Sequence, residues 1–377
     1  MDFELSDEQT MLRDASRSLL SDHSASGDVR SLIDTDIDVD PKFWQLATEL
    51  GWSGLALPEE YGGSEQGLTE LAVIAEEIGR AVGRGPFLPS VIAGLAVTRA
   101  ATGAVKSEVL PHLAEGSASA AVALDEPRRR WSSGDVRSTA TREPDGSFRL
   151  TARKTAVQDA GSARWIVVSA ELPGETALFL VGRESTGVSV RRQSVLDVTR
   201  SLYEVALDDV TVPAGELIGG ADLAQRLYDD GAVLTCADAL GAGERLLAMT
   251  VEYAKVRVQF GRAIGSFQAV KHKCATMRMQ LQGARAATYY AAMAADAGAP
   301  DASRAASVAK AYVSEAMSAL AGEALQVHGG IGFTWEHDLH LYLRRIKVDE
   351  VLFGDPRTHQ ERLCALLLAA RSLDTNV

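Results

Sequence analysis

Residues 326–334 read Gln-Val-His-Gly-Gly-Ile-Gly-Phe-Thr, and they close a long helix-forming run. Directly before them, residues 302–327 are rich in alanine, leucine and methionine with helical apolar periodicity. Two adjacent glycines then break regular structure, as a glycine pair at a helix end usually forms a turn. The same pattern recurs over residues 234–256 and 270–295. The segment 223–377 is therefore predicted to be a bundle of long antiparallel helices, here a C-terminal four-helix bundle.

The rest of the chain divides into two further segments. Residues 119–222 contain short β-prone runs punctuated by Gly, Pro and Asp, and apolar residues mostly alternate over 203–212 until Pro213. This predicts a middle antiparallel β-barrel-like domain. Residues 1–118 predict an N-terminal helical domain, whose first helix begins at a capping box formed by Ser6 and Gln9. The order predicts an α+β fold with domains 1–118, 119–222 and 223–377.

Composition excludes several classes of function. The chain has 377 residues, 46% of them hydrophobic, and a formal net charge of −13. Such acidity argues against nucleic acid as a partner, because phosphate binding needs a basic surface. No apolar run approaches the ~18 residues that span a bilayer, and the acidic start does not resemble a signal peptide. We therefore expect a cytoplasmic protein. Cys236, Cys274 and Cys364 lack metal-binding spacing and are expected to be buried reduced thiols, so no metal site is predicted.

Several short motifs occur in one order along the chain. They are Leu57-Pro58-Glu59-Glu60-Tyr61-Gly62-Gly63, Glu76-Glu77-Ile78-Gly79-Arg80, Leu124-Asp125-Glu126-Pro127, Arg257-Val258-Gln259-Phe260-Gly261-Arg262, Phe267-Gln268-Ala269-Val270-Lys271-His272 and residues 326–334. Each motif alone is weak evidence, but together they resemble the acyl-CoA dehydrogenase family over essentially the whole chain.

The resemblance implies flavin chemistry. In this family FAD lies between the β-domain and the bundle, and its adenosine diphosphate half is held by the bundle of a neighbouring subunit. The matching cofactor-binding positions are Arg257, Gln259, Phe260, Gln268, Gln326, Gly329 and Gly330. Their chemistry suits that role, because arginine offers fixed donors to a pyrophosphate. Glycine lets backbone N–H groups approach phosphate oxygens without a Cβ in the way. His328 and His272, within the same motifs, could touch phosphate or make helix-end hydrogen bonds.

The catalytic positions depart from the family pattern. The reaction removes an α-proton, so a positioned carboxylate base is needed. Most members place a Glu before a glycine near the C-terminus, and that position is Phe353 here. Others place it on the first bundle helix, at the position of Gly231. The catalytic residues are thus unknown, with Asp230 and Glu350 as nearby candidates.

The positions that would face the flavin ring also depart. The family's Trp and Thr correspond to Ala156 and Gln158, and its Gly-Ser-Asp is blurred over residues 128–135. The surface offered to a neighbour's FAD is therefore intact, while the surface for this chain's own flavin ring is degraded.

Three hypotheses follow. The chain resembles the subunit of heteromeric acyl-CoA dehydrogenases that lacks the catalytic Glu, acting on an acyl-CoA beside a related subunit. Alternatively it is a self-sufficient homo-oligomeric enzyme with an atypical base, or a scaffold subunit that binds no flavin. For the enzymatic hypotheses, the resemblance implies FAD as the cofactor and electron-transfer flavoprotein as a partner. The heteromeric relatives suggest bulky acyl groups such as steroid side-chain thioesters.

Overall fold

The computed structural model describes residues 5–23, 26–33, 35, 37–128 and 136–374. Its first region is helical, with α1 (Asp7–His23), α2 (Ser26–Ile33), α3 (Pro41–Glu49), α4 (Leu68–Ala81), α5 (Phe87–Ala100) and α6 (Gly103–Ala114). The predicted capping box opens α1: Ser6 Oγ accepts from the Gln9 N–H at 3.2 Å, and Gln9 Oε1 accepts from the Ser6 N–H at 3.0 Å. Two backbone N–H groups at the start of the helix, which have no acceptor within the helix, are thereby hydrogen-bonded.

The middle region is a sheet with its own buried core, which includes Phe148 and Phe179. Its strands are β1 (Ala120–Ala123), β2 (Thr139–Arg142), β3 (Phe148–Gln158), β4 (Trp165–Leu172), β5 (Glu175–Gly182), β6 (Val188–Arg192), β7 (Leu202–Val212) and β8 (Leu217–Gly220). They lie in the order β6-β7-β3-β2-β4-β5-β8, with β1 beside β4. The predicted antiparallel arrangement holds for most strand pairs of this sheet, but β1 and β2 both run parallel to β4. Alternation along a strand reports which face is buried, but it carries no information on the neighbour's direction.

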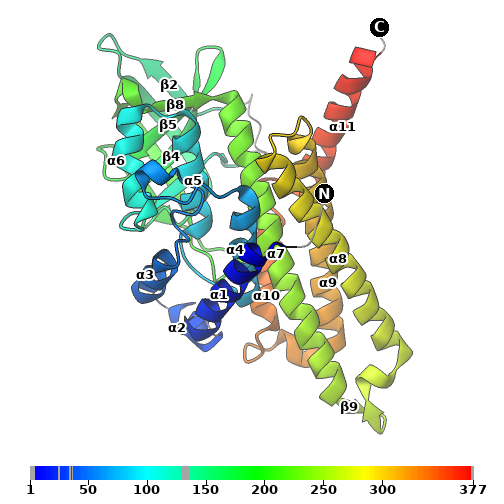
Figure 1. The fold of residues 1–377 in the computed structure, drawn as a ribbon. Helices are drawn as coiled ribbons and strands as arrows, with labels where there is room; N and C mark the ends of the chain where they lie inside the picture. The colour runs from blue at the N-terminus through cyan, green and yellow to red at the C-terminus, as the bar shows by residue number, and fades with distance from the viewer. Residues whose placement is uncertain (1–4, 24–25, 34, 36, 129–135, 375–377) are drawn as a thin grey trace.

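The third region is the helical bundle (Figure 1). It contains α7 (Ala221–Val256), α8 (Gln268–Asp296), α9 (Ala302–His328), α10 (Leu339–Asp349) and α11 (Pro356–Asp374). A short hairpin of β9 (Val258–Gln259) and β10 (Arg262–Ala263) joins α7 to α8 at the far end of the bundle. The α+β class, with helices, sheet and bundle in the predicted order, is confirmed. The domain boundaries at 118/119 and 222/223 stay a prediction.

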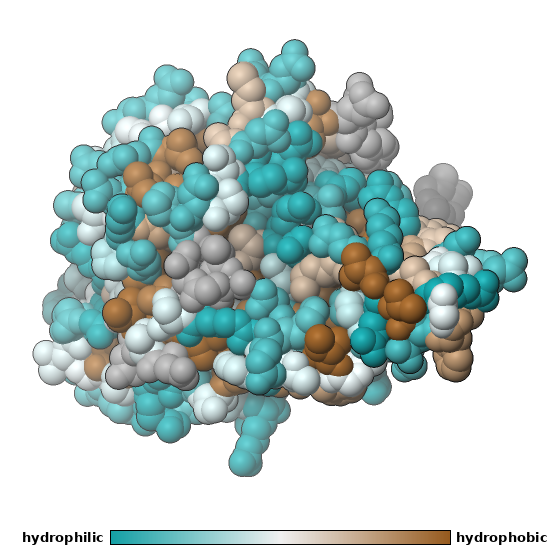
Figure 2. All heavy atoms as spheres, turned by 90° about the horizontal axis from the view of Figure 1, so that it is seen from below, coloured by the Kyte–Doolittle hydropathy of each residue, from teal (hydrophilic) through white to brown (hydrophobic). Residues whose placement is uncertain are grey.

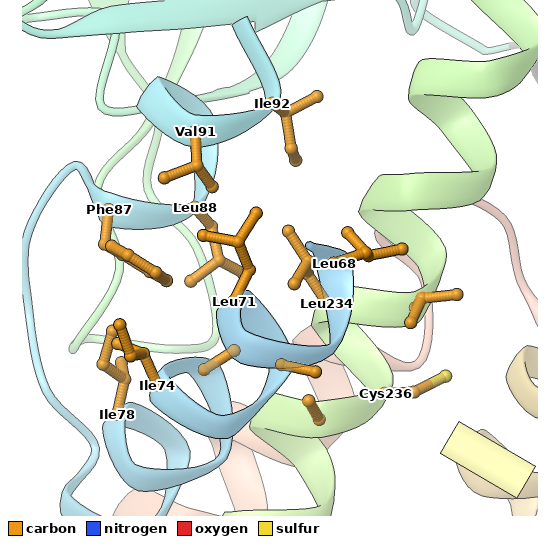
Figure 3. Packing of buried hydrophobic residues seen from close by; sticks show 14 of the residues in the cluster. Leu68, Leu71, Ile74, Ile78, Phe87, Leu88, Val91, Ile92, Leu234 and Cys236 are labelled. Atoms are coloured by element: carbon orange, nitrogen blue, oxygen red, sulfur yellow. The ribbon is translucent and has the colours of Figure 1, made fainter. Parts of the chain in front are cut away.

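Helix α4 joins the first region to the bundle. Its leucines and isoleucines pack between α5 and α7 (Figure 3). At the crossing of α4 and α7, a Cβ on Gly79 would lie 1.9 Å from the Asp238 carbonyl oxygen. A Cβ on Gly241 would lie 1.8 Å from the Glu76 carbonyl oxygen. Only glycine permits this approach, so α7 is held closely against the N-terminal helices.

A buried charge cluster ties the sheet region to the bundle. The guanidinium of Arg345, 1% exposed, donates to Asp197 at 2.8 Å and lies 3.2 Å from Asp238. Arg200, in the loop before β7, donates to Asp349 on α10 at 2.5 Å. Buried charges are tolerated when they are paired in this way. The cluster therefore fixes the β7 side of the sheet against α7 and α10.

Two predictions from composition can be compared with these elements. Among the described residues, none of the helices combines the length and the apolar character required to cross a bilayer. Of the cysteines, Cys236 is buried, Cys274 is partly exposed and Cys364 is exposed. The expectation of three buried thiols is therefore wrong for two of them, because both lie on the less covered faces of α8 and α11.

Candidate active-site cleft and cofactor clamp

The two positions that the resemblance assigns to a catalytic base meet in space. Gly231 is buried in α7, and Phe353 follows α10 with a positive φ of 53°. A Cβ added to Gly231 would lie only 2.4 Å from a ring carbon of Phe353. The aromatic ring therefore fills the space that a side chain at position 231 would need, and neither position offers a carboxylate.

The ring of Phe353 is held on several sides. Tyr228 packs against it edge-on, with ring centroids 5.9 Å apart. His359 is buried, and its Nε2 lies 2.8 Å from the Phe353 carbonyl oxygen. Burial lowers the pKa of His359 to about 4, so the ring is neutral and its Nε2–H donates to that carbonyl. Gly354 follows at φ 94°, where a Cβ would lie 2.5 Å from the Tyr228 hydroxyl oxygen.

A narrow cleft separates Phe353 from the sheet. Its lining side chains come from α5, from β1 and the loop after it, from β3, and from the segment after α10: Leu88, Pro89, Ile92, Val122, Leu124, Asp125, Thr155, Ala156, Gln158, Leu352 and Phe353. The cavity volume is about 20 Å³. That is room for roughly one water molecule.

The flavin-ring positions on β3 are engaged within the chain. The N–H of Ala156, at φ 53°, donates to the side-chain oxygen of Gln193 at 3.0 Å. The side-chain oxygen of Gln158 accepts from Arg200 at 3.1 Å. With its backbone donor covered by Gln193 and its opposite wall filled by Phe353, this cleft does not fit an isoalloxazine ring. The blurred Gly-Ser-Asp segment lies largely outside the described residues, because 129–135 are not described.

The two carboxylates considered as substitute bases lie elsewhere. Asp230 is buried and forms ion pairs with Arg99 and, at 3.5 Å, with Arg226. Glu350 accepts from Ser318 at 2.5 Å and pairs with Lys347. Neither residue lines the cleft.

Asp125 is the one acidic residue among the described lining residues of the cleft. Burial raises the pKa of its carboxyl to about 6, an effect that Lys154 partly offsets. Lys154 itself pairs with Glu126 at 3.0 Å. A carboxyl with a pKa in this range can exchange a proton near neutral pH.

The seven cofactor-binding residues expected from the motifs are all exposed: Arg257, Gln259, Phe260, Gln268, Gln326, Gly329 and Gly330. We call this set the clamp. Its first three members lie on the α7 end and the β9–β10 hairpin, Gln268 begins α8, and the rest lie at the end of α9. Phe260 is 93% exposed and adopts φ 53° beside Gly261 at φ 79°. Seen from below the bundle, hydrophobic side chains lie exposed among hydrophilic ones (Figure 2).

The clamp has the chemistry that an anionic ligand needs. Within the described part of the chain, the guanidinium of Arg257 forms no hydrogen bond or ion pair. A Cβ at Gly329 or Gly330 would meet nothing within 4 Å, so the backbone there is open to approach. The residues present therefore fit a diphosphate and an adenosine moiety presented by a neighbouring chain.

Histidines in the two motifs behave differently. His328 is buried, and its Nδ1 lies 2.8 Å from the Ala324 carbonyl oxygen, so it makes the helix-end hydrogen bond. His272 is exposed on α8. Sequence reasoning missed Tyr228, His359 and Gln193, because Tyr228 acts through a ring contact and the other two through hydrogen bonds that no motif encodes. The one sequence signal was that neither of the two alternative base positions carries a carboxylate: one is a helical glycine and the other is an aromatic residue.

Comparisons with known proteins agree with this architecture. Residues 6–117 match the N-terminal domain of acyl-CoA dehydrogenases, and residues 219–365 match their C-terminal domain. The chain is 34% identical to acyl-CoA dehydrogenase IpdE2 of Mycobacterium tuberculosis over 358 residues, covering 95% of this chain and 96% of the relative.

Solved structures extend the match to three dimensions. A variant of the Tcur3481–Tcur3483 steroid ACAD superposes with a TM-score of 0.91 at 30% identity, covering 97% of this chain and 99% of that one. The ChsE4–ChsE5 complex from Mycobacterium tuberculosis gives a TM-score of 0.91 at 27% identity, covering 98% and 99%. This chain belongs to the acyl-CoA dehydrogenase family of FAD-dependent oxidoreductases.

Proposed function

We propose that this chain is the subunit without the base in a hetero-oligomeric acyl-CoA dehydrogenase, which catalyses α,β-dehydrogenation of an acyl-CoA thioester. The observation that carries the proposal is the contact between Gly231 and Phe353, which fills the base position with an aromatic ring. The exposed clamp supports the other half of the proposal, because Arg257 and the open backbone at Gly329 and Gly330 offer donors to a ligand that a neighbouring chain presents, whereas the described cleft beside Phe353 is too small for a flavin ring.

The two chains would divide the work. A related subunit supplies the carboxylate base and the pocket for the flavin ring. This chain binds the adenosine end of that subunit's FAD, with Arg257 donating to the diphosphate and the backbone at Gly329 and Gly330 approaching it. FAD, when bound, supplies the hydride acceptor. The clamp residues orient the cofactor and carry out no proton transfer.

Substrate and partners are inferred from relatives. One matching structure is named as a steroid ACAD and another as a complex of two chains. This supports a bulky acyl-CoA as substrate and a related acyl-CoA dehydrogenase subunit as the neighbour. Electron-transfer flavoprotein is the proposed electron acceptor, and the cytoplasm the proposed location.

The test compares the chain alone with the chain co-expressed with a paralogue that carries Glu at the position of Gly231. The visible flavin spectrum and the turnover of acyl-CoA are measured for both preparations. We expect the isolated chain to be colourless and inactive and the co-purified complex to be yellow and active. A yellow, active homo-oligomer of this chain alone would contradict the proposal.

A self-sufficient enzyme remains the second candidate function because of one observation. Asp125 lines the cleft with a pKa raised to about 6, whereas Asp230 and Glu350 are engaged in ion pairs. If the isolated chain turns over acyl-CoA, Asp125→Asn should abolish that activity and Asp230→Asn should not. The third candidate, a scaffold without flavin, requires that Arg257→Ala leave the FAD content of every complex unchanged.

A further inference from the structure

The clamp is assembled from two helices that end near one another. Arg257 follows α7, and its N–H donates to the Tyr253 carbonyl oxygen at 2.9 Å. Gly329 follows α9 with φ 62°, and His328 is the last residue of that helix. A diphosphate binds by contacting a guanidinium and backbone N–H groups at once, so the spacing between these two helix ends decides whether both can engage.

One aromatic contact spans the gap between the helix ends. The rings of Tyr253 and His328 are stacked, with centroids 4.7 Å apart and planes 18° from parallel. His337, from the segment before α10, packs edge-on against His328 at 4.9 Å. His328 is 4% exposed, so this contact is shielded from water. Tyr253 lies one helical turn before Arg257, and His328 directly precedes the glycine pair.

The hydrogen bonding of His328 requires a neutral ring. Nδ1 faces a carbonyl oxygen, which only accepts, so Nδ1 carries the proton. Nε2 is buried and has no partner among the described residues. A second proton there would be a buried donor without an acceptor, next to His337. Burial lowers the pKa of His328, with a smaller contribution from His337 and against the opposing effect of the hydrogen bond to Ala324. Among the described residues, Tyr253 and His337 are the titratable side chains whose rings pack against it.

We propose that His328 is a positioning residue of the clamp, whose planar neutral ring, stacked on Tyr253, sets the distance between the Arg257 helix end and the Gly329–Gly330 turn. This inference rests on the proposed function, since it assumes that the clamp holds a partner's FAD. What the site requires is a flat aromatic ring of this thickness. At low pH, protonation of the His328 ring would disturb this stacking contact.

The experiment uses the hetero-oligomeric complex with His328→Phe and His328→Leu in this chain. Phenylalanine keeps a stacking ring and cannot be protonated, whereas leucine removes the ring. A stacked aromatic pair stabilises the arrangement of the two elements that it joins. Removal of the His328 ring should therefore speed FAD release about tenfold. We expect His328→Leu to show that acceleration and His328→Phe to stay within about twofold of the parent. His112→Leu, on α6, is the control and should release FAD at the parent rate.

The pH profile provides a readout that a purely structural role would not move. The parent complex should release FAD faster as the pH falls and His328 becomes protonated, and His328→Phe should lack this acid limb. Equal rates for the Phe and Leu variants, or an acid limb that persists in His328→Phe, would overturn the inference.

A second readout does not depend on flavin. Hydrogen exchange of the amides at residues 329–332 in the isolated chain should rise at least tenfold in His328→Leu and stay near the parent in His328→Phe, and unchanged exchange in both would reject the positioning role. Arg257→Ala distinguishes a failure of the role proposed for His328 from a failure of the clamp assignment. If it releases FAD while His328→Leu does not, only the inference fails. If Arg257→Ala has no effect, the clamp itself is wrongly assigned.

Discussion

Gly231→Ala adds one methyl group to α7, and we predict that it destabilises the chain. In an unobstructed helix interior, alanine is more favourable than glycine by about 1 kcal/mol. At position 231 the added carbon would lie 2.4, 2.5 and 2.6 Å from three ring carbons of Phe353. Carbon atoms in contact normally lie about 3.5–4.0 Å apart, so the ring would have to move by roughly 1 Å.

The ring has little freedom to make that move. Tyr228 packs on its edge, and His359 holds the Phe353 carbonyl. Overpacking of this kind costs about 1–3 kcal/mol, and the fixed surroundings favour the upper part of that range. After the gain in helix propensity, the net loss should be about 1–2 kcal/mol.

The control is Gly322→Ala on α9, where an added Cβ meets nothing within 4 Å. It should stabilise the chain by up to about 1 kcal/mol. Urea unfolding followed by far-UV circular dichroism compares the two variants with the parent. In a Phe353→Gly background the obstruction is gone, so Gly231→Ala should then stabilise. If Gly231→Ala stabilises the parent chain as much as Gly322→Ala does, then Phe353 does not obstruct a side chain at position 231.

Three further perturbations test other parts of the structure. Burial raises the pKa of Asp159 to about 7, so stability should fall by up to about 4 kcal/mol between about pH 4 and pH 7. Asp159→Asn should remove that fall and be more stable than the parent at pH 8 in urea titrations, and an unchanged pH dependence would reject the assignment. Arg345→Met leaves Asp197 and Asp238 less compensated and should cost about 3 kcal/mol in the same assay, so a neutral result would show that the buried pairs are dispensable. Phe260→Asn should change the stability of the isolated chain by less than about 0.5 kcal/mol. Asparagine tolerates the positive φ there. The hetero-oligomer should nevertheless bind FAD more than tenfold more weakly in a binding titration, because the exposed aromatic member of the clamp is lost.

The sequence alone predicts much of the fold because local signals decide it. Ser6 and Gln9 form the expected capping box, and β7 ends at Val212, directly before Pro213, as the proline predicts. The long bundle helices follow from apolar periodicity, although α7 begins at Ala221, well before the periodic run at 234–256. The parallel pairings of β1 and β2 with β4 could not be predicted, because strand direction depends on how the chain returns to the sheet.

The sequence likewise predicts one part of the candidate site and not another. The sequence motifs locate the clamp at helix ends and in a hairpin. Residues in such places are usually exposed, so the exposure of the clamp could be predicted. The cleft cannot be deduced so directly, because Gly231 and Phe353 are far apart in sequence and meet only through the packing of α7 against the segment after α10. Gln193 covers the Ala156 N–H from a loop that carries no recognisable motif. Asp230 adjoins Gly231 in sequence, yet the helix turns its carboxylate towards Arg99.

In the proposed function, the clamp of this chain holds a flavin whose ring is bound by another chain. The most direct measurement is the FAD content of the purified hetero-oligomer, with Arg257→Ala introduced in this chain only. We predict about one FAD per pair of chains in the parent complex and a large loss of FAD in the variant, with the two chains still associated. Two FAD per pair, or full retention of FAD in the variant, would contradict the account.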